Sequence, residues 1–203
     1  NLYPLASSRS AGSTVTFNGK EITVIDVEGF DFSKAQIGLF SAGGSVSEKY
    51  APIAAAAGCV VIDNTAHFRY ERDIPLVVPE VNPHAIAQYK NRGIIANPNC
   101  TTAITLMALY PLHQAFSVKR IFASSYQAVS GTGAKAIEEL ERQVGQIVNK
   151  QPVTKEVYPH QIAFNVLPQA GSFADGDTYT DEERKLINET RKIFSLPELA
   201  ISP

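Results

Sequence analysis

Short apolar runs and one amphipathic stretch alternate along the first half of the chain. The apolar runs at residues 37–41, 60–63 and 93–96 are typical of buried strands, and residues 47–57 between the first two have a helical pattern. A strand, a helix and a second strand at this spacing predict parallel strands joined by crossover helices. The sequence therefore predicts an α/β fold with a doubly wound sheet.

A hairpin is predicted nearer the N-terminus. Residues 15–24 (VTFNGKEITV) contain Asn18-Gly19 between two runs in which apolar and polar positions alternate. An Asn-Gly pair in this setting is a strong signal for a tight turn between antiparallel strands. We therefore expect a two-stranded hairpin at this place.

The pattern changes after residue 96. Residues 101–114 (TTAITLMALYPLHQ) predict an apolar helix whose buried face includes Ile104, Met107 and Leu112. A strand is expected at residues 120–126, followed by a glycine-rich turn. The change places a domain boundary between residues 98 and 99, with one domain at 1–98 and a second at 99–203.

Further elements are predicted in the second domain. Residues 134–148 form a helix in which five apolar side chains share one face: Ile137, Leu140, Val144, Ile147 and Val148. A proline-bearing loop at 151–159 precedes a strand at 162–166. Acidic residues after Thr180 suit the first turn of a helix, which we expect to continue to Phe194.

Composition narrows the class of protein. The chain has 203 residues, 44% of them hydrophobic, and a formal net charge of −2, which fits one large or two small globular domains. No basic stripe suggests nucleic acid as a partner. No apolar run approaches the ~20 residues of a membrane span, and no segment resembles a signal peptide.

Cysteine and histidine usage gives further expectations. Cys59 and Cys100 are the only cysteines, so we expect no disulfide framework and a cytoplasmic, reducing location. Cys59 lies in an apolar run and is expected in the core. The histidines have no metal-ligand spacing, so no metal site is proposed; they are His67, His84, His113 and His160.

Cys100 is the residue with the clearest chemical potential. It follows Asn97-Pro98-Asn99 and opens the helix predicted at 101–114. The positive end of a helix dipole and its unpaired N–H groups favour a thiolate, which is the nucleophilic form of cysteine. Asn99 and Thr101 offer neutral donors where an oxyanion could form. The alternative is a buried, inert cysteine that caps a core helix.

Four segments carry a family resemblance: SAGGS (41–45), NPNCTT (97–102), SYQAVSGTG (125–133) and NETRKI (188–193). Together they resemble the aspartate-β-semialdehyde dehydrogenases, and the intervening sequence matches along essentially the whole chain. SAGGS alone would be weak, whereas NPNC followed by SYQAVSG is specific. The resemblance implies a Rossmann-like NADP-binding domain followed by an α+β catalytic and dimerisation domain, as in the glyceraldehyde-3-phosphate dehydrogenase-like fold.

The resemblance also implies an activity. The family interconverts L-aspartyl-4-phosphate and L-aspartate-4-semialdehyde with NADP, through a thioester on the cysteine, in the biosynthesis of lysine, methionine and threonine. Cys100 matches the family nucleophile, and Gln127 matches the residue that orients substrate near the sulfur. An amide can do so without competing for the proton.

The substrate-binding residues are likewise implied by the resemblance. Arg69 and Lys192 match phosphate-binding positions, with Asn99 as a further donor, and Glu189 matches the carboxylate that holds the substrate amino group. From the residues alone, Arg69 is indistinguishable from Arg72. Glu189 and Lys192 are three residues apart on one helix, so an intrahelical ion pair is the alternative.

The cofactor-binding residues come from three segments. The turn after an apparent strand end matches the segment that reads the adenosine 2′-phosphate, which favours NADP over NAD. Glycines allow the backbone to approach a dinucleotide, although a glycine-rich turn is more often only a turn. The predicted set is Ser7, Arg9, Ser10, Gly43, Gly44, Ser130, Gly131 and Gly133.

Two departures from the family pattern shape the remaining expectations. A glycine-rich phosphate-binding turn normally precedes the segment that matches residue 1, and a segment with an arginine and a histidine acid/base normally follows residue 202. We therefore expect a fragment with little activity alone. A truncated non-catalytic homologue is one alternative. Another is a sister acyl-phosphate reductase, such as N-acetyl-glutamyl-phosphate reductase or glyceraldehyde-3-phosphate dehydrogenase, although SYQAVSG argues against it.

The resemblance finally implies an assembly. The family forms homodimers or homotetramers through the domain that carries the cysteine. The helix at 134–148 and the strands expected near Arg120 and Ile162 would supply that contact.

Overall fold

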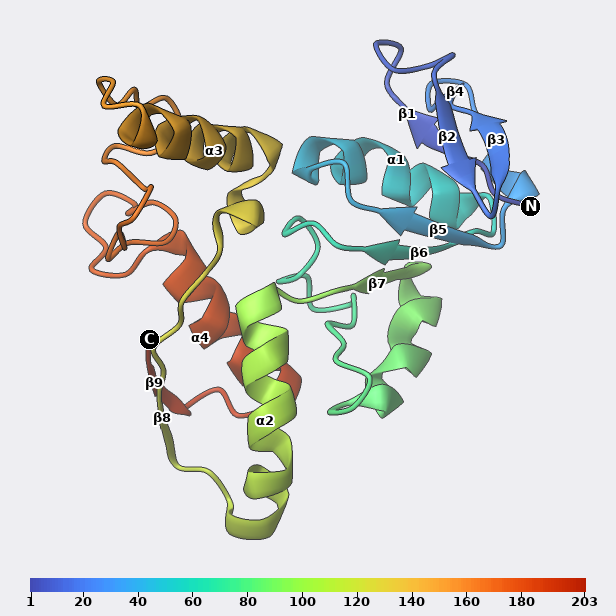
Figure 1. Ribbon diagram of the computed structural model, residues 1–203. Helices are drawn as coiled ribbons and strands as arrows, with labels where there is room; N and C mark the ends of the chain where they lie inside the picture. The colour runs from blue at the N-terminus through green and yellow to red at the C-terminus, as the bar shows by residue number, and fades with distance from the viewer. The chain divides into compact units, whose positions relative to one another are not determined.

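The chain divides into two compact units. A computed structural model describes residues 1–203 (Figure 1). The first unit comprises Asn1–Lys119 and Asn188–Leu199, and the second comprises Arg120–Ile187 and Ala200–Pro203. The boundary predicted between residues 98 and 99 remains a prediction.

A three-stranded parallel sheet forms the centre of the first unit. Its strands are β5 (Ile37–Phe40), β6 (Val60–Asp63) and β7 (Ile94–Ala96), in the order β5-β6-β7. Helix α1 (Gly44–Ala56) connects β5 to β6 and packs along the sheet (Figure 1). The parallel crossover predicted from the alternating pattern is confirmed.

Four short strands and two 3₁₀ segments complete this part of the chain. Strand β1 (Leu5–Ala6) pairs in parallel with β4 (Ile25–Asp26). The predicted hairpin is confirmed: β2 (Thr14–Phe17) pairs antiparallel with β3 (Lys20–Thr23), with Asn18-Gly19 as the turn between them. The 3₁₀ segments are η1 (Phe32–Lys34) and η2 (Pro83–Asn91).

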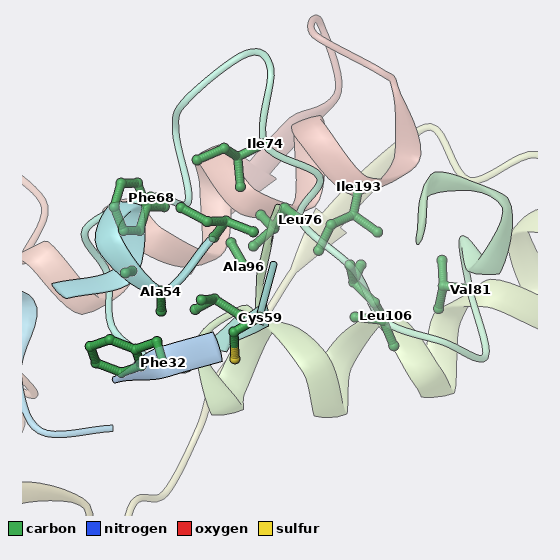
Figure 2. Close-up of a cluster of buried hydrophobic side chains, with 14 residues drawn as sticks. Phe32, Ala54, Cys59, Phe68, Ile74, Leu76, Val81, Ala96, Leu106 and Ile193 are labelled. Carbon is green, nitrogen blue, oxygen red and sulfur yellow. The ribbon is translucent and has the colours of Figure 1, made fainter. Parts of the chain in front are cut away.

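One hydrophobic core holds the first unit together (Figure 2). Ala51 and Ala54 of α1 belong to it, and Cys59 is buried within it as predicted. Two helices from later in the sequence contribute to the same core: α2 (Cys100–Phe116) through Leu106 and α4 (Asp181–Phe194) through Ile193. The cysteine helix and the end of α4 are therefore fixed to the parallel sheet by burial of apolar area.

The buried face predicted for α2 was wrong. Ile104, Met107 and Leu112 are 71%, 50% and 50% exposed, whereas Thr102 and Leu106 are completely buried. Most positions along this helix are apolar, so the pattern does not select one face. The face that is buried is the one that carries Leu106 into the core.

The second unit contains one strand pair and one long helix. Strand β8 (Arg120–Phe122) pairs in parallel with β9 (Ala200–Ser202) and ends before the predicted residue 126. The glycine-rich turn forms the short 3₁₀ helix η3 (Val129–Thr132). Helix α3 (Ala134–Val148) has the predicted bounds.

The strand predicted at 162–166 is absent, because a side chain takes the place of a strand partner. The amide oxygen of Gln143 accepts hydrogen bonds from the backbone N–H groups of Ile162 (2.9 Å) and Ala163 (3.1 Å). Phe164 and Val166, whose apolar character suggested a strand, are exposed. The segment is therefore fixed to α3 as irregular backbone.

Helix α3 buries a polar face rather than its apolar one. Glu139 and Gln143 are buried, and Glu139 accepts hydrogen bonds from the backbone N–H groups of Glu156 (2.9 Å) and Tyr158 (3.4 Å). The apolar face predicted for this helix stays partly open, with Ile137 and Val148 exposed. None of the helices is both long and apolar enough to span a membrane.

Candidate functional site

Cys100 is the first residue of α2 and is exposed. Strand β7 ends at Ala96, and Asn97-Pro98-Asn99 leads from it into the helix. Asn99 is the N-cap residue, and its side-chain oxygen accepts a hydrogen bond from the backbone N–H of Thr101 at 2.9 Å. The predicted helix start is confirmed, and the exposure of the sulfur contradicts the alternative of a buried capping cysteine.

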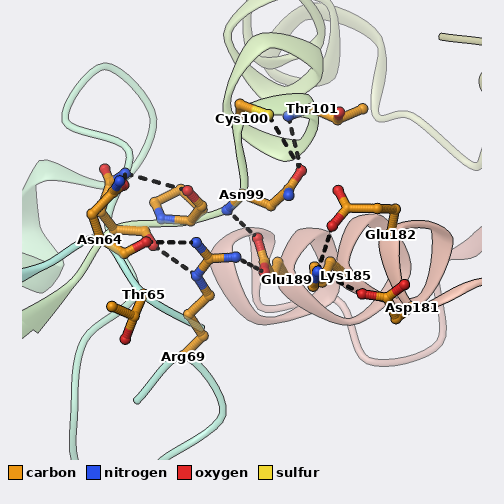
Figure 3. A network of polar contacts seen from close by, with 12 residues as sticks. Asn64, Thr65, Arg69, Asn99, Cys100, Thr101, Asp181, Glu182, Lys185 and Glu189 are labelled. Carbon is orange, nitrogen blue, oxygen red and sulfur yellow. Dashed lines mark hydrogen bonds and ion pairs between the residues drawn. The ribbon is translucent and has the colours of Figure 1, made fainter. Parts of the chain in front are cut away.

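A buried ion pair lies beside this turn (Figure 3). Nη1 of Arg69 is 2.9 Å from Oε1 of Glu189. Arg69 is 6% exposed and Glu189 is 0% exposed, so water screens this pair very little. The two residues come from the segment after β6 and from α4, and both belong to the first unit.

The other hydrogen bonds of Arg69 and Glu189 are with backbone groups of this turn and of the segment after β6. Arg69 donates from Nε to the carbonyl oxygen of Asn97 (2.9 Å) and from Nη2 to that of Asn64 (3.0 Å). Oε2 of Glu189 accepts from the backbone N–H of Asn99 at 2.7 Å. Three predicted site residues, Arg69, Asn99 and Glu189, are thus brought together immediately before Cys100.

Lys192 also lies in the first unit, one helical turn after Glu189. Its ammonium group donates to the carbonyl oxygens of Arg69 (2.8 Å), Glu71 (2.6 Å) and Ile74 (2.9 Å). Burial lowers the pKa of Lys192, and the negative charges of Glu71 and Asp73 act in the opposite direction. Lys192 therefore binds the loop after Arg69, and the ion pair considered between Glu189 and Lys192 is replaced by the pair of Glu189 with Arg69.

The predicted cofactor residues of the first unit lie after two strands. Ser7, Arg9 and Ser10 are exposed in a turn after β1, closed by a hydrogen bond from the N–H of Ser10 to the carbonyl of Ser7 at 2.9 Å. Gly43 and Gly44 lie between β5 and α1. The carboxyl ends of parallel strands are where open α/β sheets bind nucleotides.

The backbone at Gly43 fits a bound phosphate group. Gly43 has a φ of +102° at the N-cap position, and a Cβ there would have no atom within 4 Å. No side chain caps this helix start, so the N-terminal end of α1 is open toward an anion. These residues fit a dinucleotide in the place the resemblance implies.

The predicted residues of the second unit lie on one short segment. Gln127 is exposed between β8 and η3, Ser130 and Gly131 lie in η3, and Gly133 is the N-cap of α3. A Cβ on Gly131 would be 2.5 Å from Nε2 of Gln127, so the glutamine side chain occupies the space that this glycine leaves. The approach of Gln127 to Cys100 remains a prediction.

Three polar residues at the ends of β6 and β7 belong to the same network and were missed from the sequence. Asn97 donates from Nδ2 to Oδ1 of Asn64 at 2.7 Å. Asp63 is completely buried and accepts from the hydroxyl of Ser47 in α1 at 2.7 Å. Their position at the carboxyl ends of neighbouring parallel strands could have indicated from the sequence that they belong to the site.

Comparison with known proteins agrees with this arrangement. Residues 1–89 match the NAD-binding domain of semialdehyde dehydrogenases, and residues 109–203 match the semialdehyde dehydrogenase dimerisation domain. The aspartate-semialdehyde dehydrogenase of Shewanella sp. (strain DB6705) is 57% identical over 202 residues, which are 100% of this chain and 60% of that protein. The chain thus spans about 60% of the length of this relative.

Solved structures show the same likeness. The crystal structure of aspartate semialdehyde dehydrogenase II complexed with ASA from Vibrio cholerae has a TM-score of 0.95 and 53% identity, covering 99% of this chain and 60% of that one. Aspartate semialdehyde dehydrogenase with NADP from Candida albicans has a TM-score of 0.65 and 25% identity, covering 95% and 52%. The chain therefore belongs to the semialdehyde dehydrogenase family and contains its NAD-binding and dimerisation domains.

Proposed function

We propose that the protein containing this chain is an NADP-dependent aspartate-semialdehyde dehydrogenase of lysine, methionine and threonine biosynthesis. The observation that carries the proposal is the exposed Cys100 at the first residue of α2, inside the NPNC segment. The 57% identity to the Shewanella enzyme supports it, as does the likeness to a Vibrio cholerae structure that contains ASA.

The chemistry follows from the position of the sulfur. The thiolate of Cys100 attacks the acyl carbon of L-aspartyl-4-phosphate, the bond from that carbon to the phosphate oxygen breaks, and phosphate leaves. NADPH, when bound, supplies the hydride that reduces the resulting thioester. The carbon–sulfur bond then breaks, the aldehyde is released and the thiolate returns. We assign Gln127 the role of orienting the substrate.

Arg69 and Lys192 differ in how many N–H donors each has available for a phosphate. A guanidinium has five N–H donors, so the three bonds of Arg69 to Asn97, Asn64 and Glu189 leave donors for a phosphate oxygen. An ammonium has three, and Lys192 uses all of them on backbone carbonyls. A phosphate role for Lys192 therefore requires an exchange of at least one of these bonds.

For the cofactor we propose NADP rather than NAD. The segment after β1 offers the charge of Arg9 and the hydroxyls of Ser7 and Ser10, and no carboxylate that would bind a ribose hydroxyl. The Candida albicans structure with NADP supports the same choice. Gly43, Gly44, Ser130, Gly131 and Gly133 complete the proposed cofactor set.

We also propose that the protein forms a homodimer, and that aspartyl phosphate, aspartate semialdehyde and phosphate are its small-molecule partners. The match of residues 109–203 to a dimerisation domain supports the assembly. The partly open apolar face of α3 supplies a surface of suitable chemistry.

The test uses the full-length protein. Formation of NADPH is followed after addition of L-aspartate-4-semialdehyde, phosphate and NADP⁺. We expect turnover by the wild type and none by Cys100→Ser, with circular dichroism unchanged. Turnover of N-acetyl-glutamyl semialdehyde in place of the aspartate compound would overturn the substrate assignment, and full activity of Cys100→Ser would overturn the mechanism.

A further inference from the structure

Residues 97–99, which lead from β7 into α2, belong to no strand, yet backbone groups at both ends of this turn form hydrogen bonds. The carbonyl of Asn97 accepts from Arg69, and the N–H of Asn99 donates to Glu189. The backbone N–H of Asn97 also donates to the carbonyl of Asp63 at 2.8 Å. The hydrogen bonds with Arg69 and Glu189 therefore help to fix the backbone of the residues immediately before Cys100, beside the side-chain bond of Asn97 to Asn64 (Figure 3).

We propose that Glu189 and Arg69 act as a pair of positioning residues for Cys100. Glu189 holds the N–H of the N-cap residue, and Arg69 holds Glu189 together with the carbonyl of Asn97, so the first turn of α2 has one fixed orientation. The inference rests on the proposed function of Cys100 as the nucleophile. It assigns Glu189 a task besides the binding of a substrate amino group.

The burial of the carboxylate supports this assignment. Glu189 is 0% exposed, and each of its two oxygens accepts a short bond from a group of this chain, one charged and one backbone. A carboxylate buried in this way is stable only when its acceptor sites are satisfied. Its two partners, Asn99 and Arg69, are 90 and 120 residues away in the sequence, so the bond from Asn99 ties α4 to the cysteine turn and the ion pair ties it to the segment after β6.

The arginine is suited to this task because its donors point in fixed directions. Its guanidinium reaches Asn64, Asn97 and Glu189 at once, each within 3.0 Å. Lys192 binds the carbonyl oxygen of Arg69 itself, so the arginine backbone is also held. A lysine in place of Arg69 would keep the charge but lose the planar fork.

Glu189→Asp is the informative variant. It keeps the charge but shortens the side chain by one methylene, so the carboxylate cannot reach Asn99 and Arg69 together. Thr190→Val is the matched control, because Thr190 is the next residue of α4, is equally buried, and has a hydroxyl with no hydrogen-bond partner. Loss of that hydroxyl removes no bond.

Two measurements on the folded full-length protein report on the turn without any turnover. The first is amide hydrogen exchange of Asn99, measured by NMR. The second is the rate of alkylation of Cys100 by iodoacetamide across a range of pH, followed by mass spectrometry. Arg69, Glu189 and Lys192 are the charged groups in the bonds described around this turn, and Glu189→Asp changes none of their charges.

We expect Glu189→Asp to raise Asn99 exchange at least tenfold relative to its neighbours in α2. The rate of alkylation of Cys100 should fall about threefold to fivefold near neutral pH. This corresponds to the stabilisation that a helix N-terminus gives to a negative charge, here the thiolate. Thr190→Val should leave both unchanged. If Glu189→Asp does not fold, Arg69→Lys is examined in the same way, with the same expected direction.

The inference is overturned if a folded Glu189→Asp or Arg69→Lys protein retains wild-type Asn99 exchange and wild-type alkylation. It is also overturned if Thr190→Val produces the same changes, because the effect would then come from any disturbance of α4. Failure of the proposed function is a separate result, since it would appear as absence of turnover by the full-length wild type while these two measurements keep their expected values.

Discussion

The two cysteines differ in the properties that govern thiol reactivity. Cys59 is 1% exposed, and burial raises the pKa of its thiol. Cys100 is exposed at a helix start. Reactivity depends on thiolate character and access, so iodoacetamide at pH 7 should label Cys100 at least about tenfold faster than Cys59. Peptide mapping by mass spectrometry measures both rates, and equal labelling in the folded chain would show that Cys100 is not accessible.

Gly131 provides a second test at the level of one residue. A Cβ there would be 2.5 Å from Nε2 and 3.3 Å from Cγ of Gln127, so Gly131→Ala must displace the whole glutamine side chain. Gln127 is exposed and flexible, and we expect the cost in unfolding free energy to stay near 1 kcal/mol. If Gln127 orients the substrate, kcat/KM of the full-length protein should fall about tenfold or more.

The control for that variant is another glycine of the same unit. Gly145 lies inside α3, and a Cβ there would meet no atom within 4 Å. Gly145→Ala should therefore raise stability by about 0.5–1 kcal/mol through helix propensity and leave kcat/KM unchanged. A Gly131→Ala protein with wild-type kcat/KM would remove Gln127 from the proposed mechanism.

At the level of elements, the start of α4 is held by a reciprocal pair of bonds. The hydroxyl of Thr180 accepts from the N–H of Glu183 at 3.3 Å, and the Glu183 carboxylate accepts from the N–H of Thr180 at 2.6 Å. Loss of such a cap costs about 1 kcal/mol, so Thr180→Ala should lower the unfolding free energy by about that amount in a urea titration. Thr178→Ala, at an exposed position, should have no measurable effect.

The loop after α3 should be sensitive to acid because it is bonded to a buried carboxylate. Burial raises the pKa of Glu139. Hydrogen bonds from the backbone N–H groups of Val157, Glu156 and Tyr158 together lower it by more than burial raises it, so the pKa lies below its ordinary value of 4.5. Stability from this carboxylate is therefore present above pH 4.5 and is lost as the pH falls through the lowered folded pKa.

Glu139→Gln tests this sign. The variant has no titrating group at the position, so the unfolding free energy of the wild type should fall more steeply than that of the variant as the pH decreases below 4.5. Urea titrations at several pH values between neutral and acidic conditions measure both slopes. Parallel pH dependence of the two proteins would show that Glu139 has the same affinity for protons in the folded and unfolded states.

How far these elements could be predicted depends on whether local pattern decides them. The sheet strands and α3 were predicted because their periodicity is set by adjacent residues. The segment at 162–166 was not, because its N–H groups bond to Gln143 from another element. Burial of Glu139 was also missed, since a polar residue is ordinarily assigned to the exposed face of a helix.

The residues of the candidate site also differ in how far adjacent sequence could predict them. Cys100 and its cap Asn99 could be predicted from adjacent residues, because both follow from one turn and one helix start. The bonds of Glu189 to Arg69 and Asn99 join residues that are far apart in the sequence. No local signal indicates such pairs, and they become visible only when α4 packs into the core through Ile193.

At the level of the whole molecule, the apolar face of α3 makes self-association testable. Ile137 and Val148 are 38% and 71% exposed on a helix whose buried face is polar. An apolar stripe left open in this way is typical of an interface. If α3 contributes to a homodimer, the double variant Ile137→Lys and Val148→Lys should place like charges in the contact.

Sedimentation velocity measures the association of the double variant and so tests whether the apolar face of α3 is an interface. We expect the double variant to dissociate at concentrations at least about tenfold above those at which the wild type dissociates, because each charge buried without a partner costs more than the 1.4 kcal/mol that a factor of ten represents. Leu39→Lys, at an 80% exposed position of β5, is the control and should leave association unchanged. A double variant that associates as tightly as the wild type would place the contact on another element, because both side chains are exposed within their own unit and their replacement should leave its fold intact.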